Sequence, residues 1–219
     1  MKVKMKFAAP LLMWALIFSI VTAGNAVYAE LNKKSDAKCI TEEMVKLKTD
    51  MQKVWIDHTI WTRSYIVSAI SERPDQKYVL ERLLRNQQDI GNVIKPYYGE
   101  EAGNKLADLL REHILIAAKI VEAAKANKQE DVKQLQAEWH RNADQMAKFL
   151  SEANPNWKYK QLQDMLYTHL ELITKIVISC LQGDWKADIE ATDANEVHMI
   201  HLADILTEGI IKQFPEKFS

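Results

Sequence analysis

The stretch Leu106–Leu150 reads LADLLREHILIAAKIVEAAK, then a short polar break, then EDVKQLQAEWHRNADQMAKFL. Apolar residues recur every three or four positions in both halves, which is the period of an amphipathic helix buried on one face. The stretch therefore predicts a helical hairpin. In its first half, His113 lies on the apolar face, where a leucine of the core would be expected. This buried-type histidine is the best indication of function in the sequence.

The same arrangement recurs on both sides of this hairpin. His58 lies 55 residues before His113 and His169 lies 56 residues after it, each among large apolar residues at helical spacing. The second helix of each hairpin carries an aspartate 31, 31 and 35 residues after the histidine, respectively: Asp89, Asp144 and Asp204. A constant interval of this kind indicates an internal repeat. We therefore expect an all-α, up-and-down bundle of about six helices, built from three repeated helical hairpins.

Composition supports the all-α prediction and gives the domain limits. The chain of 219 residues has only 6 glycines and 5 prolines, some of which fall at the breaks, and no segment alternates with the two-residue period of a strand. Helices are expected at about 41–71, 75–98, 100–126, 129–151, 158–183 and 185–213, with breaks near Gly99, Asn127 and Pro155. The sequence thus predicts a flexible segment over 30–40 and a single helical-bundle domain over 41–219.

The first 29 residues have the pattern of a secretory signal peptide. Three lysines precede the apolar run Phe7–Ala23, and the small-residue site Val27-Tyr28-Ala29 follows it. We expect export to the cell envelope or the medium, and no stable membrane span after cleavage. Removing the three lysines lowers the 29 basic residues to 26 against 30 acidic ones. A mildly acidic mature chain argues against nucleic acid as a partner.

The histidines and aspartates at mid-height of their helices predict a polar layer in the core. Buried polar groups require either a dense hydrogen-bond network or a metal ion. Imidazole and carboxylate ligands suit zinc, iron, manganese or nickel. The candidate ligands of one such ion, of which not all need contact it, are His58, His113, His169, Asp89, Asp144 and Asp204. The alternative is a cell-envelope interaction module in which the polar layer has a purely structural role, fixing the register of the helices.

Several longer strings resemble a known family. WIDHTIWTRSYIVSAI, LLRNQQDIGNVIKPYYGEEAGNKL, ANPNW, DMLYTHLELI and LTEGIIKQFP are similar to a family of small secreted bacterial all-helical proteins of unknown function, and the likeness covers 45–218. Names such as glycosyltransferase or acetylglutamate kinase are sometimes transferred within that family. The sequence contains no glycine-rich phosphate loop, no Asp-x-Asp signature and no predicted strand, which argues against both activities. It contains no recognisable catalytic motif, and whether the protein is an enzyme stays open at this point.

Overall fold

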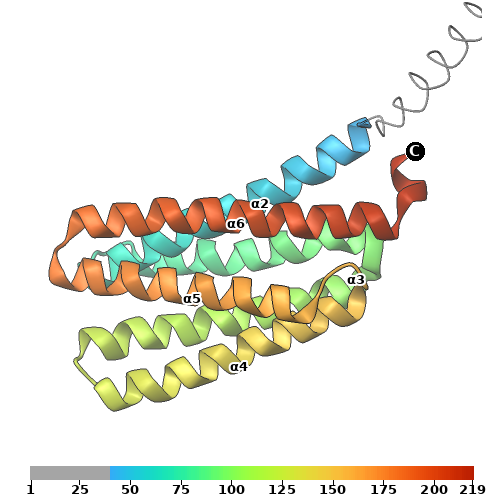
Figure 1. Cartoon of the computed structure of the whole chain (residues 1–219). Helices are drawn as coiled ribbons and strands as arrows, with labels where there is room; N and C mark the ends of the chain where they lie inside the picture. Colours follow the sequence, from blue (N-terminus) through green and yellow to red (C-terminus); the bar gives the residue numbers. More distant parts are fainter. Residues whose placement is uncertain (1–39) are drawn as a thin grey trace, which may run out of the picture. The chain divides into compact units, whose positions relative to one another are not determined.

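A computed structural model describes residues 40–219, and these form an all-helical structure (Figure 1). The elements are α2 (Glu42–Ile70), α3 (Gln76–Lys125), α4 (Gln129–Ala153), α5 (Tyr159–Gln182), α6 (Trp185–Gln213) and the short 3₁₀-helix η1 (Pro215–Phe218). No strand is present among these residues, which confirms the all-α prediction. The predicted signal peptide and most of the predicted N-terminal segment, residues 1–39, lie outside the described residues.

The residues expected to form the second and third helices belong to one element, α3, which folds back on itself at Gly99. Gly99 has a φ of 84°, a conformation that glycine adopts without steric cost. Twelve residues of straight helix would span about 18 Å. A Cβ added to Gly91 would nevertheless lie 2.4 Å from the carbonyl oxygen of Gly103, so the backbones of the two arms of α3, 76–98 and 100–125, are in contact. The expectation of six separate helices arranged as three hairpins is therefore not confirmed in that form.

The helices pack as sequential antiparallel neighbours, and the first also packs against the last. α2 contacts α3 and α6, α3 contacts α4, α4 contacts α5, and α5 contacts α6. Near the start of α2, the Gln52 amide donates to Asp204 of α6 at 2.7 Å. Near the end of α2, the Arg63 guanidinium pairs with the fully buried carboxylate of Asp188, near the start of α6. The opposite order of these pairs along the two helices shows that α2 and α6 are antiparallel.

A single apolar core joins the five helices. Met51 of α2, Met146 of α4, Ile176 of α5 and Ile210 of α6 are almost completely buried in it, together with Ile116 of α3. Within residues 40–219, none of the helices combines the length and the apolar character needed to cross a membrane. The core also contains buried polar side chains, and these define the candidate site.

Candidate functional site

Three histidines from three helices meet in the middle of the core. His58 of α2, His113 of α3 and His169 of α5 are 1%, 2% and 3% exposed. The ring centroids are 5.6 Å apart for His58 and His169, and 6.2 Å apart for His113 and His169. The structure thus brings together three residues that the sequence separates by more than a hundred positions. We refer to His58, His113 and His169 as the histidine cluster.

The hairpin of α3 and α4 shows most completely how a histidine is held. Oδ1 of Asn142 lies 2.8 Å from Nδ1 of His113, and Nδ2 of the same amide donates to the carbonyl oxygen of Leu109 at 3.1 Å. Leu109 lies four residues before the histidine. A carbonyl only accepts, so this second bond fixes the orientation of the amide and makes Nδ1–H of His113 the donor to Oδ1. His113 therefore carries its proton on Nδ1 and a lone pair on Nε2.

The hairpin of α5 and α6 divides these two bonds between two residues. Oδ1 of Asn195 lies 2.7 Å from Nδ1 of His169. The carbonyl oxygen of Met165, again four residues before the histidine, accepts from Nε2 of His198 at 2.8 Å. Nδ2 of Asn195 has no hydrogen-bond partner in the described part of the chain.

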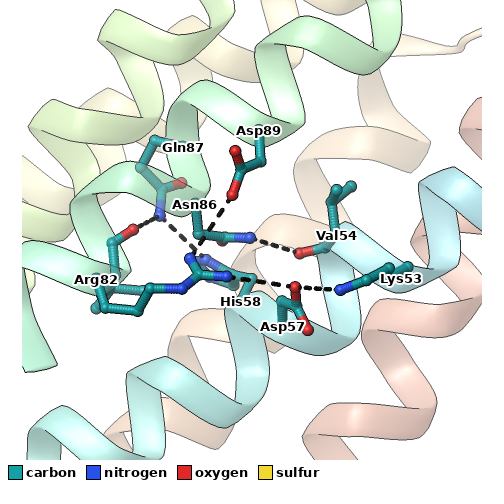
Figure 2. Close-up of polar contacts among 9 residues, drawn as sticks. Lys53, Val54, Asp57, His58, Arg82, Asn86, Gln87 and Asp89 are labelled. Atoms are coloured by element: carbon teal, nitrogen blue, oxygen red, sulfur yellow. Dashed lines mark hydrogen bonds and ion pairs between the residues drawn. The ribbon is translucent and has the colours of Figure 1, made fainter.

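In the hairpin of α2 and the first arm of α3, the carbonyl at the corresponding position also accepts a hydrogen bond, but the histidine is held less tightly. Figure 2 shows the Asn86 amide donating at 3.0 Å to the carbonyl oxygen of Val54, four residues before His58. Nε2 of Gln87 lies 3.5 Å from Nδ1 of His58 and donates to the Leu83 carbonyl at 2.8 Å. A separation of 3.5 Å is too long for a strong hydrogen bond. His58 is thus the least restrained member of the cluster.

The three aspartates proposed as ligands bond to other side chains. Asp89 lies 3.6 Å from the Arg82 guanidinium, which also approaches Asp57 on α2 (Figure 2). Asp144 accepts from the Tyr167 hydroxyl at 2.8 Å. Asp204 accepts from Gln52, as described above. Each of these aspartates is partly exposed, and among residues 40–219 none has a histidine of the cluster as a hydrogen-bond partner.

Burial keeps all three imidazoles uncharged. It lowers the pKa of His113 to about 3 and the pKa of His169 to about 4. The pKa of His58 is lowered well below its usual value, first by burial and then by the neighbouring rings, because charge on one ring opposes charge on the next. The hydrogen bonds that His113 and His169 donate to Asn142 and Asn195 oppose the effect of burial on their pKa values without cancelling it. All three rings are therefore neutral at pH 7.

Unpaired polar atoms gather around the cluster. Nε2 of His113 is buried and has no hydrogen-bond partner in the described residues. The same holds for Oδ1 of Asn86, Oε1 of Gln87 and Nδ2 of Asn195. A buried polar atom left unpaired costs roughly 1–3 kcal/mol. A metal ion could satisfy the lone pairs of the nitrogen and oxygen acceptors among these atoms, whereas Nδ2 of Asn195 is a donor and needs an acceptor. A ligand that supplied such partners would be bound favourably.

The amide residues of this layer were not predicted as site residues. Gln87 lies 29 residues after His58 and Asn142 lies 29 residues after His113. His198 follows His169 at the same interval. This interval is the same in all three hairpins, whereas the interval to the aspartates varies. It was the sequence signal that could have identified the residues in contact with the histidines or their helices. Asn195 lies 26 residues after His169, about one helical turn before His198, so it does not follow the 29-residue interval.

Comparison with protein-family models, curated proteins and solved structures finds no match to this chain. The resemblance to a family of secreted bacterial proteins therefore stays a prediction, and the site is interpreted from its own geometry.

Proposed function

We propose that the histidine cluster binds a transition metal ion, such as zinc, iron, manganese or nickel. The observation that supports this most directly is the meeting of three buried, neutral imidazoles from α2, α3 and α5, with Nε2 of His113 unpaired. A neutral imidazole nitrogen with a free lone pair is the form that coordinates metals.

The surroundings of the cluster suit histidine ligands. A metal-binding histidine usually donates its other ring N–H to an oxygen, which fixes the tautomer and the ring orientation. Oδ1 of Asn142 and Oδ1 of Asn195 lie in this position beside His113 and His169. Three histidines with a fourth position open to water or a small ligand is a common arrangement for a reactive zinc ion.

The proposed site requires a local adjustment. As the side chains lie, no three His, Cys, Asp or Glu residues between 40 and 219 are grouped so that they could hold an ion. Imidazole nitrogens lie about 2.0–2.1 Å from bound zinc. Binding therefore requires the rings to shift until the three Nε2 atoms face one point, while Nδ1 of His113 and of His169 stays bonded to its asparagine, so His58, the least restrained ring, has to move most. The three aspartates are not included in the proposed ligand set, because they bond to other side chains.

Titration of the metal-free protein with each metal tests the proposal. Calorimetry should show saturable binding of one ion per chain, and His113→Gln or His169→Gln should weaken it at least tenfold. Asn142→Ala, which leaves all three ligands in place, should weaken binding about 10- to 100-fold. His201→Gln is the matched control because His201 is exposed on α6. Absence of saturable binding of all four metals would refute the proposal.

A second candidate is the interaction module with a structural polar layer. Its support is the bond that each hairpin makes to the carbonyl oxygen four residues before its histidine, from Asn86, Asn142 and His198 in turn. Such bonds fix the register of two helices. In this case the melting temperature of the exported protein should not change with a strong chelator or with added zinc, manganese or iron. Under the metal proposal, the chelator should lower it and one of the metals should restore it.

We also propose that the chain consists of three copies of one hairpin unit. The support is the recurrence of the same acceptor carbonyl and of the 29-residue interval in all three. Each unit would then bury its apolar face against its neighbours. A chain truncated after residue 156 should lose cooperative unfolding. If the truncated chain still melts cooperatively, the units are independent modules.

We propose, finally, that the protein works outside the cytoplasm. The support is the basic, apolar and small-residue pattern of residues 1–29. Expression in a bacterial host followed by mass measurement of the mature chain tests this. The expected product begins at Glu30, and an uncleaved cytoplasmic chain would exclude export.

A further inference from the structure

A second candidate site lies beside the histidine cluster. A pocket of about 290 Å³ is enclosed by α2, α3, α4 and α5. Its wall includes Trp139, whose ring lies against the ring of His113 with centroids 5.0 Å apart. Ile178 and Leu181 of α5 line the pocket and are 47% and 40% exposed, so they mark the side from which a molecule can enter.

The size of the pocket suits a small organic molecule. An apolar protein cavity of about 150 Å³ is large enough to bind benzene. A pocket about twice as large therefore accommodates a molecule of about ten to thirteen non-hydrogen atoms. Pockets of this size that are mainly apolar, with a few polar groups, are the usual form of small-molecule sites.

The lining determines the chemical class of the molecule. Among the described residues that line the pocket, none is charged, and aliphatic side chains from all four helices predominate. A charged ligand would lose its hydration there without gaining an ion pair. Thr62 lines the same pocket, is 6% exposed, and has a hydroxyl with no hydrogen-bond partner in residues 40–219. A polar atom of the ligand would supply the partner that this hydroxyl lacks.

We infer that this pocket binds an uncharged molecule with an apolar body of about ten to thirteen non-hydrogen atoms and one hydrogen-bonding oxygen. The apolar body packs against the aliphatic walls, and the oxygen bonds to the Thr62 hydroxyl. The inference does not depend on metal binding, because none of the three histidines lines the pocket.

Three related compounds test the size, polarity and charge of the ligand. Calorimetry with the full mature protein should show saturable binding of 2-naphthol, with naphthalene about three- to tenfold weaker because it lacks the hydroxyl. The anion 2-naphthoate should bind at least a hundredfold more weakly than 2-naphthol. Thr62→Val should remove the preference for 2-naphthol over naphthalene while both still bind. Equal affinities of the naphthol and the anion in the wild type would overturn the inference.

Two adjacent alanines provide a matched pair of variants. Ala117 lines the pocket, whereas Ala118 faces the outer groove between α3 and α4, and both are partly buried. Ala117→Trp should fill the pocket and abolish 2-naphthol binding, and Ala118→Trp should leave it unchanged. Helical circular dichroism of both variants shows that each is folded. Equal binding by the two folded variants would place the ligand elsewhere and refute the inference.

A side chain from a second copy of the protein is the competing occupant. In that case the protein would self-associate as its concentration rises, and Ala117→Trp would prevent this association. Sedimentation of the wild type and the variant distinguishes the two occupants. Self-association that Ala117→Trp abolishes, in a protein that shows no saturable binding of 2-naphthol, would replace the small molecule by the second copy.

Discussion

The hairpins α3–α4 and α5–α6 hold their histidines by the same two bonds but with different residues. In α3–α4, Asn142 both accepts from His113 and donates to the backbone carbonyl four residues earlier. In α5–α6, Asn195 accepts from His169, and His198 donates to the corresponding carbonyl. An amide presents its oxygen and its NH₂ group side by side, so one asparagine serves both purposes. The His198 imidazole donates its Nε2–H to the Met165 carbonyl. A second residue, Asn195, is therefore needed to accept from His169.

The comparison shows that position and geometry recur in this bundle while residue type varies. The acceptor carbonyl always lies four residues before the histidine, and its donor comes from the facing helix. The difference also predicts unequal energetics. One residue in α3–α4 makes the interactions that two residues share in α5–α6. The stability of the α3–α4 hairpin should therefore be more sensitive to a single substitution.

The largest effect is expected from acid. The unfolded chain protonates its histidines near pH 6.5, whereas the folded values of His113 and His169 are about 3 and 4. Below pH 6.5 the unfolded state therefore binds more protons, and stability falls as the pH falls towards 4. Each buried histidine contributes about 1.4 kcal/mol per pH unit, so the three histidines of the cluster contribute about 4 kcal/mol per pH unit. Above about pH 7 the cluster should contribute no pH dependence.

Histidine variants isolate this contribution in urea titrations of the metal-free protein between pH 7 and 5. His113→Gln and His169→Gln should each remove about one third of the cluster's contribution to the slope of unfolding free energy against pH. This holds although the two histidines have different hydrogen-bond partners. His140 and His198 lie near these rings and lower their pKa values further when protonated. His201→Gln is the control, because His201 is exposed on α6 and its replacement leaves the three rings of the cluster in place. Slopes that match the wild type in both cluster variants would show that these rings are not neutral in the folded state.

An intermediate effect is expected from the asparagines. Asn142→Ala removes the bonds to His113, to the Leu109 carbonyl and to Glu112, and it leaves Nδ1 of His113 buried without a partner, which should cost about 3 kcal/mol. Asn195→Ala likewise leaves Nδ1 of His169 without a partner, but it removes only one bond and also removes the unpaired Nδ2 atom, so about 1.5 kcal/mol is expected. Chemical denaturation at pH 7 measures both. Equal losses would contradict the difference between the two hairpins.

The smallest effect is expected from His198. His198→Ala removes the donor to the Met165 carbonyl, which should cost about 1 kcal/mol. The unpaired Nδ2 of Asn195 could then take over that carbonyl, as Asn142 does in its own hairpin. A double-mutant cycle with Asn195→Ala should accordingly show a coupling of about 0.5–1 kcal/mol. Strict additivity would mean that the two residues do not share the carbonyl.

The helices could be predicted from the sequence because their determinants are local. Apolar periodicity gave helix limits close to those of the structure, and the Thr41 hydroxyl accepts from the Met44 N–H at the start of α2. The break at Gly99 was expected, and a positive φ explains it. The direct contact between Gly91 and Gly103 was not predicted, because it depends on how the two arms of α3 meet.

The candidate site was only partly predictable. The interval between a histidine and an aspartate does not say which side of its helix the aspartate faces. Successive residues turn by about 100° around a helix, so Asp144 lies about 200° from Asn142 and faces away from His113. The same argument separates Asp89 from Gln87. Burial of the three histidines followed from their apolar neighbours. The unpaired Nε2 of His113 and the pocket beside the cluster depend on how the helices assemble, and no local sequence pattern predicts them.

The packing of the first helix against the last has a consequence for chain connectivity. Glu43 at the start of α2 and Lys217 after α6 line the same surface groove, so both ends of the described domain lie at one end of the bundle (Figure 1). A short linker could join them, and new termini could be opened at the exposed turn after α3, where Asn127 has a positive φ. Such a circular permutant keeps every helix contact while changing the order in which the helices are synthesised. If this permutant folds, the native arrangement of the bundle is specified by its neighbouring faces and not by the point at which the chain begins.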